Sequence, residues 1–399
     1  MRKRVAIINI YKAKLYLIYL LMFLFFLMPP ISENILSIKL ISIIKMLSYF
    51  TIAIYIIFNF KKISYTMFLI IFFNISLIFS TLISKGELLE AIKHALIVIA
   101  ICVILNDIID NDIKLIPFIH VIRDLSLIVF IINIILFIIY PTGIPSITYD
   151  SEFPYFLYGN VNSTIKHILP GMCCSSIIDY KNGKKISLWT SIFVFGIFYQ
   201  AMNIYFTATA VFNCIFIILW IYFINKYKNI DIRKIYLILV LIIFILEIML
   251  VLRLKLITYF SDFIGKDFDF NGRIFLWNNA IDAIGKKVFF GYGLLNDSSL
   301  VYIIGNFYGA HNYFLDIFFQ RGIIGFSLLI LIILYPISIK IIIKSSDIVK
   351  LLFGYTISCL ILFLTEPIYN KEFLIIPIIY SLLYSIERIN KEQGIKKLG

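Results

Sequence analysis

Long apolar runs separated by short polar segments make up most of this sequence. An α-helix needs about 20 mostly apolar residues to cross roughly 30 Å of hydrocarbon, and runs of that kind recur from one end of the chain to the other. The pattern predicts about twelve membrane-spanning helices, at residues 15–29, 40–59, 65–83, 90–105, 116–139, 163–179, 187–203, 206–224, 235–252, 322–340, 349–366 and 373–387. The sequence shows none of the alternating segments of about ten residues that mark a membrane β-barrel. We therefore expect an all-α, polytopic integral membrane protein in which residues 1–399 form a single membrane domain.

The composition agrees with this class, because 61% of the residues are hydrophobic and only 15% are charged. The basic start and first apolar run resemble a signal peptide, but the run ends in the polar segment 28–34 without a small-residue cleavage site. We interpret it as a retained first helix. The five cysteines all lie inside apolar runs and form no Cys-x-x-Cys pair, which predicts small buried hydrophobes rather than a zinc site or a disulfide framework: Cys102, Cys173, Cys174, Cys214 and Cys359.

The basic residues predict the orientation of the chain, since cytoplasmic loops carry an excess of Lys and Arg. If the N-terminus is cytoplasmic, most basic turns fall inside, whereas the outside segments 141–160 and 367–370 carry no Lys or Arg. The acidic segment 106–114 also falls inside, but acidic residues count little in this rule. Both termini are then expected in the cytoplasm. The net charge of +13 then mainly reflects the basic residues of cytoplasmic loops. Nucleic-acid binding is a poor explanation of this charge.

Residues 252–321 form a long insert of mixed polarity between apolar runs, and we expect it to be a helical extracytoplasmic loop. From Arg273 onward, helical periodicity places apolar residues on one face, which predicts an amphipathic interfacial helix with Trp277 as its membrane anchor: Ile274, Trp277, Ile281 and Ile284. Asn271 is the expected N-cap, and Gly285 the expected end. The Gly-Tyr-Gly run at 291–293 predicts a turn. A second helix is expected over 311–321, ended by Gly322. A shorter outside segment, 140–163, is rich in Pro, Gly and Tyr.

The insert gathers basic residues around one histidine, His311: Arg253, Lys255, Lys266, Arg273, Lys286, Lys287 and Arg321. Such a cationic surface at the membrane suits an anionic, lipid-attached substrate. Arginine binds phosphates through bidentate charge-assisted bonds, and a neutral histidine can take a proton from a sugar hydroxyl. Snorkelling is the structural alternative for Arg273, and helix capping the alternative for His311. Of the remaining histidines, His94 and His120 lie near span ends, and the pair at 166–167 is the better minor candidate.

The order GRIFLW…GYG…AHNYFLDIFFQRGIIGF, in a large outside loop before the last spans, resembles the O-antigen polymerase and ligase superfamily. Members of this superfamily typically show Arg and Trp, then Gly-x-Gly, then His-Asn, then Gly-x-x-Gly. The matching positions here are Arg273, Trp277, Gly291, Gly293, His311, Asn312, Gly322 and Gly325. Many members also carry Ser-Arg at the start of an earlier span, where this chain reads YFTATAVFN (205–213) and has no arginine.

The resemblance implies an integral-membrane glycosyltransferase with a GT-C-like fold. It would act without a metal or other cofactor on undecaprenyl-diphosphate-linked oligosaccharides, at the outer face of a bacterial cytoplasmic membrane. His311 and Arg273 are the expected catalytic residues. The expected substrate-binding residues are Arg253, Asn312, Arg321, Lys166 and His167. The lipid bilayer and a chain-length regulator are the other expected partners, and no nucleic acid is expected.

Three functions remain open on the sequence. A polymerase would join repeat units into O-antigen, capsule or exopolysaccharide, and is the favoured reading because the motif is degenerate. A ligase would transfer the glycan to the lipid A core with the same phosphate-binding residues and base. A glycolipid transporter or flippase is disfavoured, since transporters place their sites at the midplane on broken helices, whereas the polar residues here gather outside the spans.

Overall fold

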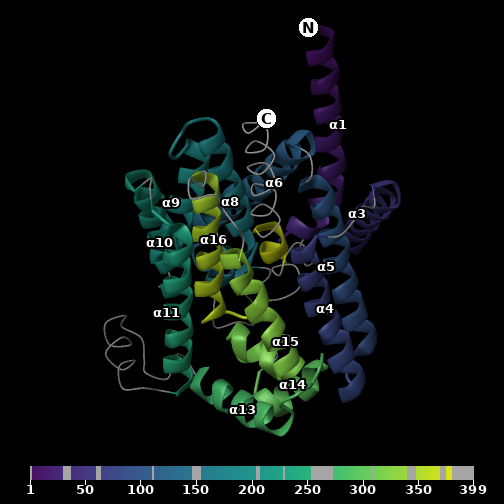
Figure 1. The fold of residues 1–399 in the computed structure, drawn as a ribbon, viewed down its shortest axis with the longest axis vertical. Helices are drawn as coiled ribbons and strands as arrows, with labels where there is room; N and C mark the ends of the chain where they lie inside the picture. Colours follow the sequence, from purple (N-terminus) through teal and green to yellow (C-terminus); the bar gives the residue numbers. More distant parts are fainter. Residues whose placement is uncertain are drawn as a thin grey trace.

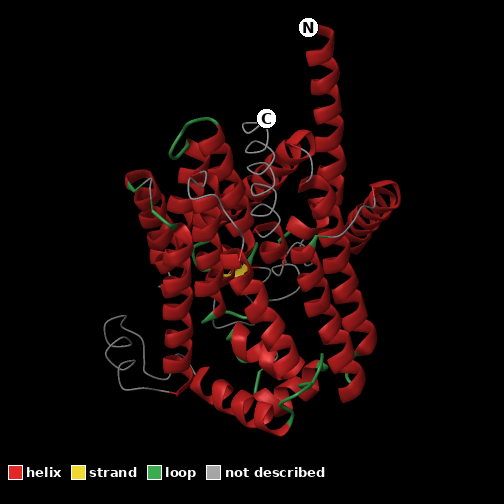
Figure 2. Cartoon of the chain, viewed as in Figure 1, coloured by secondary structure: helices red, strands yellow, loops and turns green. Residues whose placement is uncertain are grey.

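The computed structural model describes residues 2–29, 37–59, 64–109, 112–145, 154–203, 207–227, 230–252, 273–306, 309–338, 347–368 and 374–379. Helices dominate these ranges (Figures 1 and 2). The first half contains α1 (Arg2–Leu27), α3 (Ile38–Asn59), α4 (Tyr65–Ser84), α5 (Leu88–Ile109), α6 (Asp112–Ile139), α8 (Thr164–Lys181) and α9 (Leu188–Asn203). The second half contains α10 (Ala208–Lys226), α11 (Ile232–Leu252), α13 (Arg273–Lys286), α14 (Asp297–Ile304), α15 (Tyr313–Ser338) and α16 (Asp347–Phe363).

The prediction of a polytopic, all-α membrane protein is confirmed. In the described part of the chain, eight helices are long and apolar enough to cross a membrane, at Asn9–Leu27, Ile38–Asn59, Tyr65–Ser84, Leu88–Ile108, Ile113–Ile139, Ala208–Lys226, Ile232–Val251 and Tyr313–Tyr335. Helices α8, α9 and α16 coincide with three further predicted spans. The total of twelve is not confirmed, and all but residues 374–379 of the predicted span at 373–387 lie outside the described residues.

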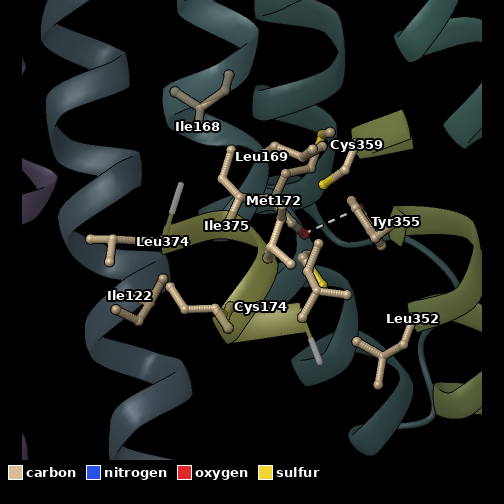
Figure 3. Packing of buried hydrophobic residues seen from close by; sticks show 14 of the residues in the cluster. Ile122, Ile168, Leu169, Met172, Cys174, Leu352, Tyr355, Cys359, Leu374 and Ile375 are labelled. Atoms are coloured by element: carbon tan, nitrogen blue, oxygen red, sulfur yellow. Dashed lines mark hydrogen bonds between the residues drawn. The ribbon is translucent and has the colours of Figure 1, made fainter. Parts of the chain in front are cut away.

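Helix α8 lies inside the bundle, which explains its more polar sequence. Figure 3 shows its side chains packed against α16, where the hydroxyl of Tyr355 donates to the carbonyl of Met172 at 3.2 Å. The same hydroxyl lies 2.7 Å from Oγ of Ser176. Near its C-terminal end, Asp179 accepts a hydrogen bond from Thr190 of α9. Polar groups are tolerated in a spanning helix when neighbouring helices satisfy them. The five cysteines are free and buried in this core, as predicted.

The only strands among the described residues are β1 (Tyr155–Phe156) and β2 (Gly159–Asn160). They form a small antiparallel hairpin in the Pro-, Gly- and Tyr-rich segment 140–163. The 3-10 turn η1 (Val161–Ser163) connects this hairpin to α8. Asn133 of α6 accepts a hydrogen bond from the backbone N–H of Leu157, so the hairpin is held against the bundle.

Helices α13 and α14 lie across one end of the bundle, opposite the N-terminus of α1 (Figure 1). The expected helix from Arg273 is present and ends at Lys286, one residue beyond the predicted Gly285. Its expected cap, Asn271, lies outside the described residues. Helix α14 was not predicted, although Asn296 caps it by accepting from the N–H of Ser299.

The predicted role of Trp277 as a membrane anchor is wrong. Its side chain is only 3% exposed, and its indole N–H donates to the carbonyl of Ala310 at 2.9 Å. The buried face of α13 also includes Leu276, Ala280 and Ala283, whereas Ile281 of the predicted apolar face is exposed. The helix is therefore turned so that its small residues pack against the start of α15. The hydrophobic periodicity predicted the helix correctly but placed the centre of its buried face wrongly. Alanine counts as only weakly hydrophobic, although its small side chain allows the close helix packing seen here.

The predicted helix over 311–321 and the span that follows it form one element, α15, with a kink at Gly322. This residue has φ 59° and ψ −163°, a conformation in which a side chain is strained. A Cβ atom here would also meet the backbone of Phe289 in the preceding turn. The turn lies at 288–290, directly before the predicted 291–293, and both glycines of 291–293 have positive φ. The Oγ of Ser80 and the N–H of Gly293 both bond to the carbonyl of Gln320, at 2.5 and 2.8 Å, which joins α4, the turn and α15.

We predict that the insert faces the outside of the cell. A cysteine placed at the exposed Asp297 should react with a membrane-impermeant thiol reagent in outer-membrane-permeabilised cells. The native cysteines are all buried, so they should add little background labelling. A cysteine at the exposed Lys184, just after the C-terminal end of α8, serves as the control. This position is predicted to face the cytoplasm, so it should react only after lysis. The reverse pattern of labelling would contradict the proposed orientation.

Candidate functional site

The turn that follows α16 is the point where distant segments of the chain meet. Arg273, at the start of α13, donates from Nη1 to the carbonyl of Thr365 at 2.6 Å. Lys166, in the first turn of α8, donates from Nζ to the carbonyl of Pro367 at 3.0 Å. The hydroxyl of Thr209 in α10 lies 2.8 Å from that of Thr365. The two cations and the threonine thus meet at one turn, 364–367.

Glu366 lies between the two cations. Its Oε1 is 3.5 Å from Nη2 of Arg273, and its Oε2 is 4.0 Å from Nζ of Lys166. The carboxylate is buried, as is the lysine. Both separations are longer than those from the same cations to the backbone carbonyls, so the carboxylate is held more loosely than the turn that carries it. A ligand with stronger negative charge could replace it without breaking those carbonyl bonds.

His311 faces the same two cations. Burial, followed by the positive charges of Arg273 and Lys166, lowers the pKa of His311 from 6.5 to about 3. The imidazole is therefore neutral at physiological pH. Its Nε2 lies 3.3 Å from the amide nitrogen of Asn306, and its backbone has φ 53°, in the left-handed region. The structure thus brings both predicted catalytic residues, His311 and Arg273, together with Lys166.

The strained backbone of His311 is held by its neighbours on both sides. Ala310 is fixed through its carbonyl by Trp277 and through its N–H by Oδ1 of Asp316, at 2.9 and 2.8 Å. Asn312 follows, and its Oδ1 accepts from the N–H of Leu315 at 3.0 Å. Left-handed backbone at a residue other than glycine persists only where its surroundings determine it. The sequence Ala-His-Asn therefore positions the imidazole rigidly.

The amide of Asn312 is fully buried and already engaged. Its Nδ2 lies 2.9 Å from both carboxylate oxygens of Glu247 in α11, and 3.2 Å from the carbonyl of Leu364. These contacts tie the start of α15 to α11 and to the turn at 364–367. The amide is thus a positioning group in the described arrangement, and substrate binding by Asn312 stays a prediction.

Two predicted site residues, Arg321 and His167, make other contacts in the structure, and a third, Arg253, lies outside the described residues. Arg321 lies between α4 and α15, where its guanidinium carbon is 3.9 Å from the centre of the Phe73 ring. The Nδ1 atom of His167 is 2.9 Å from the carbonyl of Ser163, and its ring lies against Tyr158, with centroids 5.3 Å apart. The substrate-binding roles predicted for these residues remain predictions.

Two residues of the site were missed from the sequence, Glu247 and Glu366. Both interrupt apolar stretches, and an ionisable residue within a membrane span is a functional hypothesis by default. That signal was available in the sequence. The segment expected to carry an arginine instead contributes the hydroxyl of Thr209, while the second cation of the cluster comes from Lys166 on α8.

Comparison with known proteins agrees with this geometry. Residues 179–330 match the model of a family described as O-antigen ligase, and this range contains Arg273, His311 and Asn312. No curated protein and no solved structure matches the chain. The match confirms the resemblance seen in the sequence and does not separate polymerases from ligases. The chain is therefore a multi-pass membrane protein, and its residues 179–330 are similar to the O-antigen ligase family.

Proposed function

We propose that this protein is a membrane glycosyltransferase that polymerises undecaprenyl-diphosphate-linked oligosaccharide repeat units. The reaction would take place at the outer face of a bacterial cytoplasmic membrane, with both termini of the chain in the cytoplasm. The observation that carries the proposal is the convergence of Arg273 and Lys166 beside a buried, neutral His311. Two cations and a neutral base are what the transfer of a glycan from a diphosphate requires.

The two cations would bind the diphosphate of the donor lipid. In the structure they face the single carboxylate of Glu366 at 3.5 and 4.0 Å. A diphosphate carries more negative charge than a carboxylate, and the planar guanidinium of Arg273 suits its oxygens. The diphosphate would take the position of the carboxylate while the carbonyls of Thr365 and Pro367 keep both cations in place.

His311 would accept the proton of the attacking hydroxyl. The hydroxyl oxygen of the acceptor sugar forms a bond with the anomeric carbon of the donor glycan. The bond from that carbon to the diphosphate breaks, and its electron pair leaves with the diphosphate. The hydroxyl proton passes to the imidazole. The bound diphosphate offsets the positive charges that hold the pKa of His311 low, so the base becomes stronger once the donor is in place.

The ligase is the second candidate, because the matching family model is described as O-antigen ligase. A ligase would use the same cations and base but would transfer the glycan to the lipid A core. The choice between the two depends on the acceptor. A chain-length regulator is a partner only in the polymerase proposal, because a regulator of this kind sets how often the transfer repeats.

Arg273→Lys should lower activity about 10- to 100-fold, since a charge-assisted hydrogen bond contributes roughly 1.5–3 kcal/mol and lysine cannot form the bidentate pair. Arg273→Ala should be at least as severe. The measurement is polymer formation in cells at equal amounts of membrane-inserted protein. Lys286→Ala, exposed at the other end of α13, is the matched control and should be near normal. Near-normal polymer from Arg273→Ala would show that the arginine does not bind the donor.

His311→Ala should reduce the rate on the order of 10²–10⁴-fold, as loss of a general base does. If the protein is a polymerase, cells should show a single repeat unit on the lipid A core instead of a ladder of chain lengths. A bare core with retained lipid-linked polymer would instead identify a ligase. Tyr302→Ala, at the most exposed aromatic residue of α14, is the control and should keep the ladder. A full ladder from His311→Ala would exclude the histidine from the mechanism.

The pH dependence follows from the lowered pKa of His311, about 3. In the free protein the imidazole stays neutral from pH 8 to pH 5, so kcat/KM should show no acid limb from this residue in that window.

Below pH about 6.5 the unfolded chain takes up a proton at this position and the folded chain does not, so the free energy of unfolding falls as the pH is lowered toward 3. A limb near pH 6.5 would contradict a buried histidine.

A further inference from the structure

A groove between α4 and α15 contains a buried cation. It has a volume of about 170 Å³ and is lined by apolar side chains, two serines and one arginine: Phe72, Ile75, Ser76, Phe79, Ser80, Phe290, Arg321, Ile324 and Leu328. Phe72, Phe79 and Ile324 are exposed on the outer faces of these helices. The groove therefore opens sideways, toward the space that the bilayer hydrocarbon fills around a spanning helix.

Arg321 has no carboxylate within ion-pair distance in the described part of the chain. Its side chain is only 7% exposed and stacks on the ring of Phe73. One guanidinium nitrogen, Nη1, donates to the carbonyl of Phe73, while Nε is buried without a hydrogen-bond partner. The titratable groups that interact with it electrostatically, Tyr313 and His94, supply no negative charge at neutral pH. A buried charge of this kind is costly unless an anion pairs with it.

The backbone of α15 makes room for this arginine. A Cβ atom at Gly325 would lie 2.2 Å from Cβ of Arg321 and 3.0 Å from its Cδ. The stem of the arginine thus occupies the space that a larger residue would need. The kink at Gly322 comes directly after the arginine, and the carbonyl of Gln320 is held by Ser80. These contacts fix the guanidinium beside the groove instead of letting it extend to the membrane surface.

The groove and the candidate site are two separate cationic positions connected by α15. His311 and Arg321 are ten residues apart, which at 1.5 Å per residue is about 15 Å along a helix. The polymerase reaction needs two lipid-linked diphosphates at once. The donor diphosphate leaves at the reacting carbon, but the acceptor diphosphate lies at the far end of its repeat unit from the attacking hydroxyl. A second anionic position must therefore lie an oligosaccharide length from the first.

We propose that the groove between α4 and α15 binds the lipid diphosphate of the acceptor, with Arg321 against the phosphates and the apolar walls against the isoprenoid chain. This proposal rests on the polymerase function proposed above. An anionic head on a hydrocarbon chain matches both properties of the groove, its buried cation and its sideways opening. The acceptor repeat unit would then extend from Arg321 toward His311, which limits how long a repeat the enzyme accepts.

The test measures how many molecules of undecaprenyl diphosphate the full-length protein binds in phosphatidylcholine nanodiscs. Wild-type protein should bind two. Ile324→Trp, which fills the groove from an exposed position, and Arg321→Gln should each weaken one of the two at least tenfold. Leu331→Trp, at another exposed position of α15 away from the groove, is the matched control and should bind two. Arg273→Ala should lose the other molecule.

The outcomes separate the two proposals. If Arg273→Ala loses one molecule while Ile324→Trp and Arg321→Gln still bind two and polymerise normally, the groove proposal is overturned and the proposed function stands. If phosphatidylglycerol displaces the groove-bound molecule as readily as undecaprenyl diphosphate does, the groove holds ordinary anionic lipid and the proposal is overturned. If wild-type protein binds no undecaprenyl diphosphate, the proposed function fails and the groove proposal fails with it.

Discussion

The site depends on the need to satisfy the backbone carbonyls of the turn that follows α16 inside the bundle. Buried carbonyls outside a helix lack the hydrogen-bond partners that a helix supplies, and in a low-dielectric interior each one must find a donor. Here the carbonyls of 364, 365 and 367 receive donors from three separate elements: Asn312, Arg273 and Lys166. One structural requirement therefore draws α8, α13 and the start of α15 to a single turn. The positive charge that a phosphate would need comes from the donors that complete the fold.

This dual role gives the site an electrostatic property that a surface cluster would lack. Burial lowers the pKa of His311, and the same two cations that bind the turn lower it further. The free protein thus holds a weak base that stays neutral under mildly acidic conditions. In the proposed reaction, an anionic donor would offset the contribution of the two cations to this weakness, while burial would remain. The base would then become stronger once the donor replaces the carboxylate of Glu366.

The sequence predicted most of the fold because a helix that crosses a bilayer needs a long run of hydrophobic residues. It predicted α8 as a span although this helix is less apolar, and it identified Arg273 and His311 as partners across 38 residues. It failed where packing between protein segments decides the outcome. The buried face of α13 was misplaced at Ile281, and Trp277 was assigned to lipid although Ala310 holds it. Glu366 belongs to the site because the turn after α16 places its carboxylate between Arg273 and Lys166. The hydrophobic pattern along the chain does not predict such a tertiary contact.

Lys166 supplies the second cation of the cluster from α8. Many members of the superfamily carry an arginine where this chain reads 205–213 without one, and in the structure Thr209 of this segment lies against Thr365. Lys166 reaches the turn from the first turn of α8. A diphosphate responds to the position of charge and not to the helix that supplies it. If the cation can come from different helices, few positions in the sequence need to be invariant. A degenerate motif is then compatible with the same arrangement of positive charge.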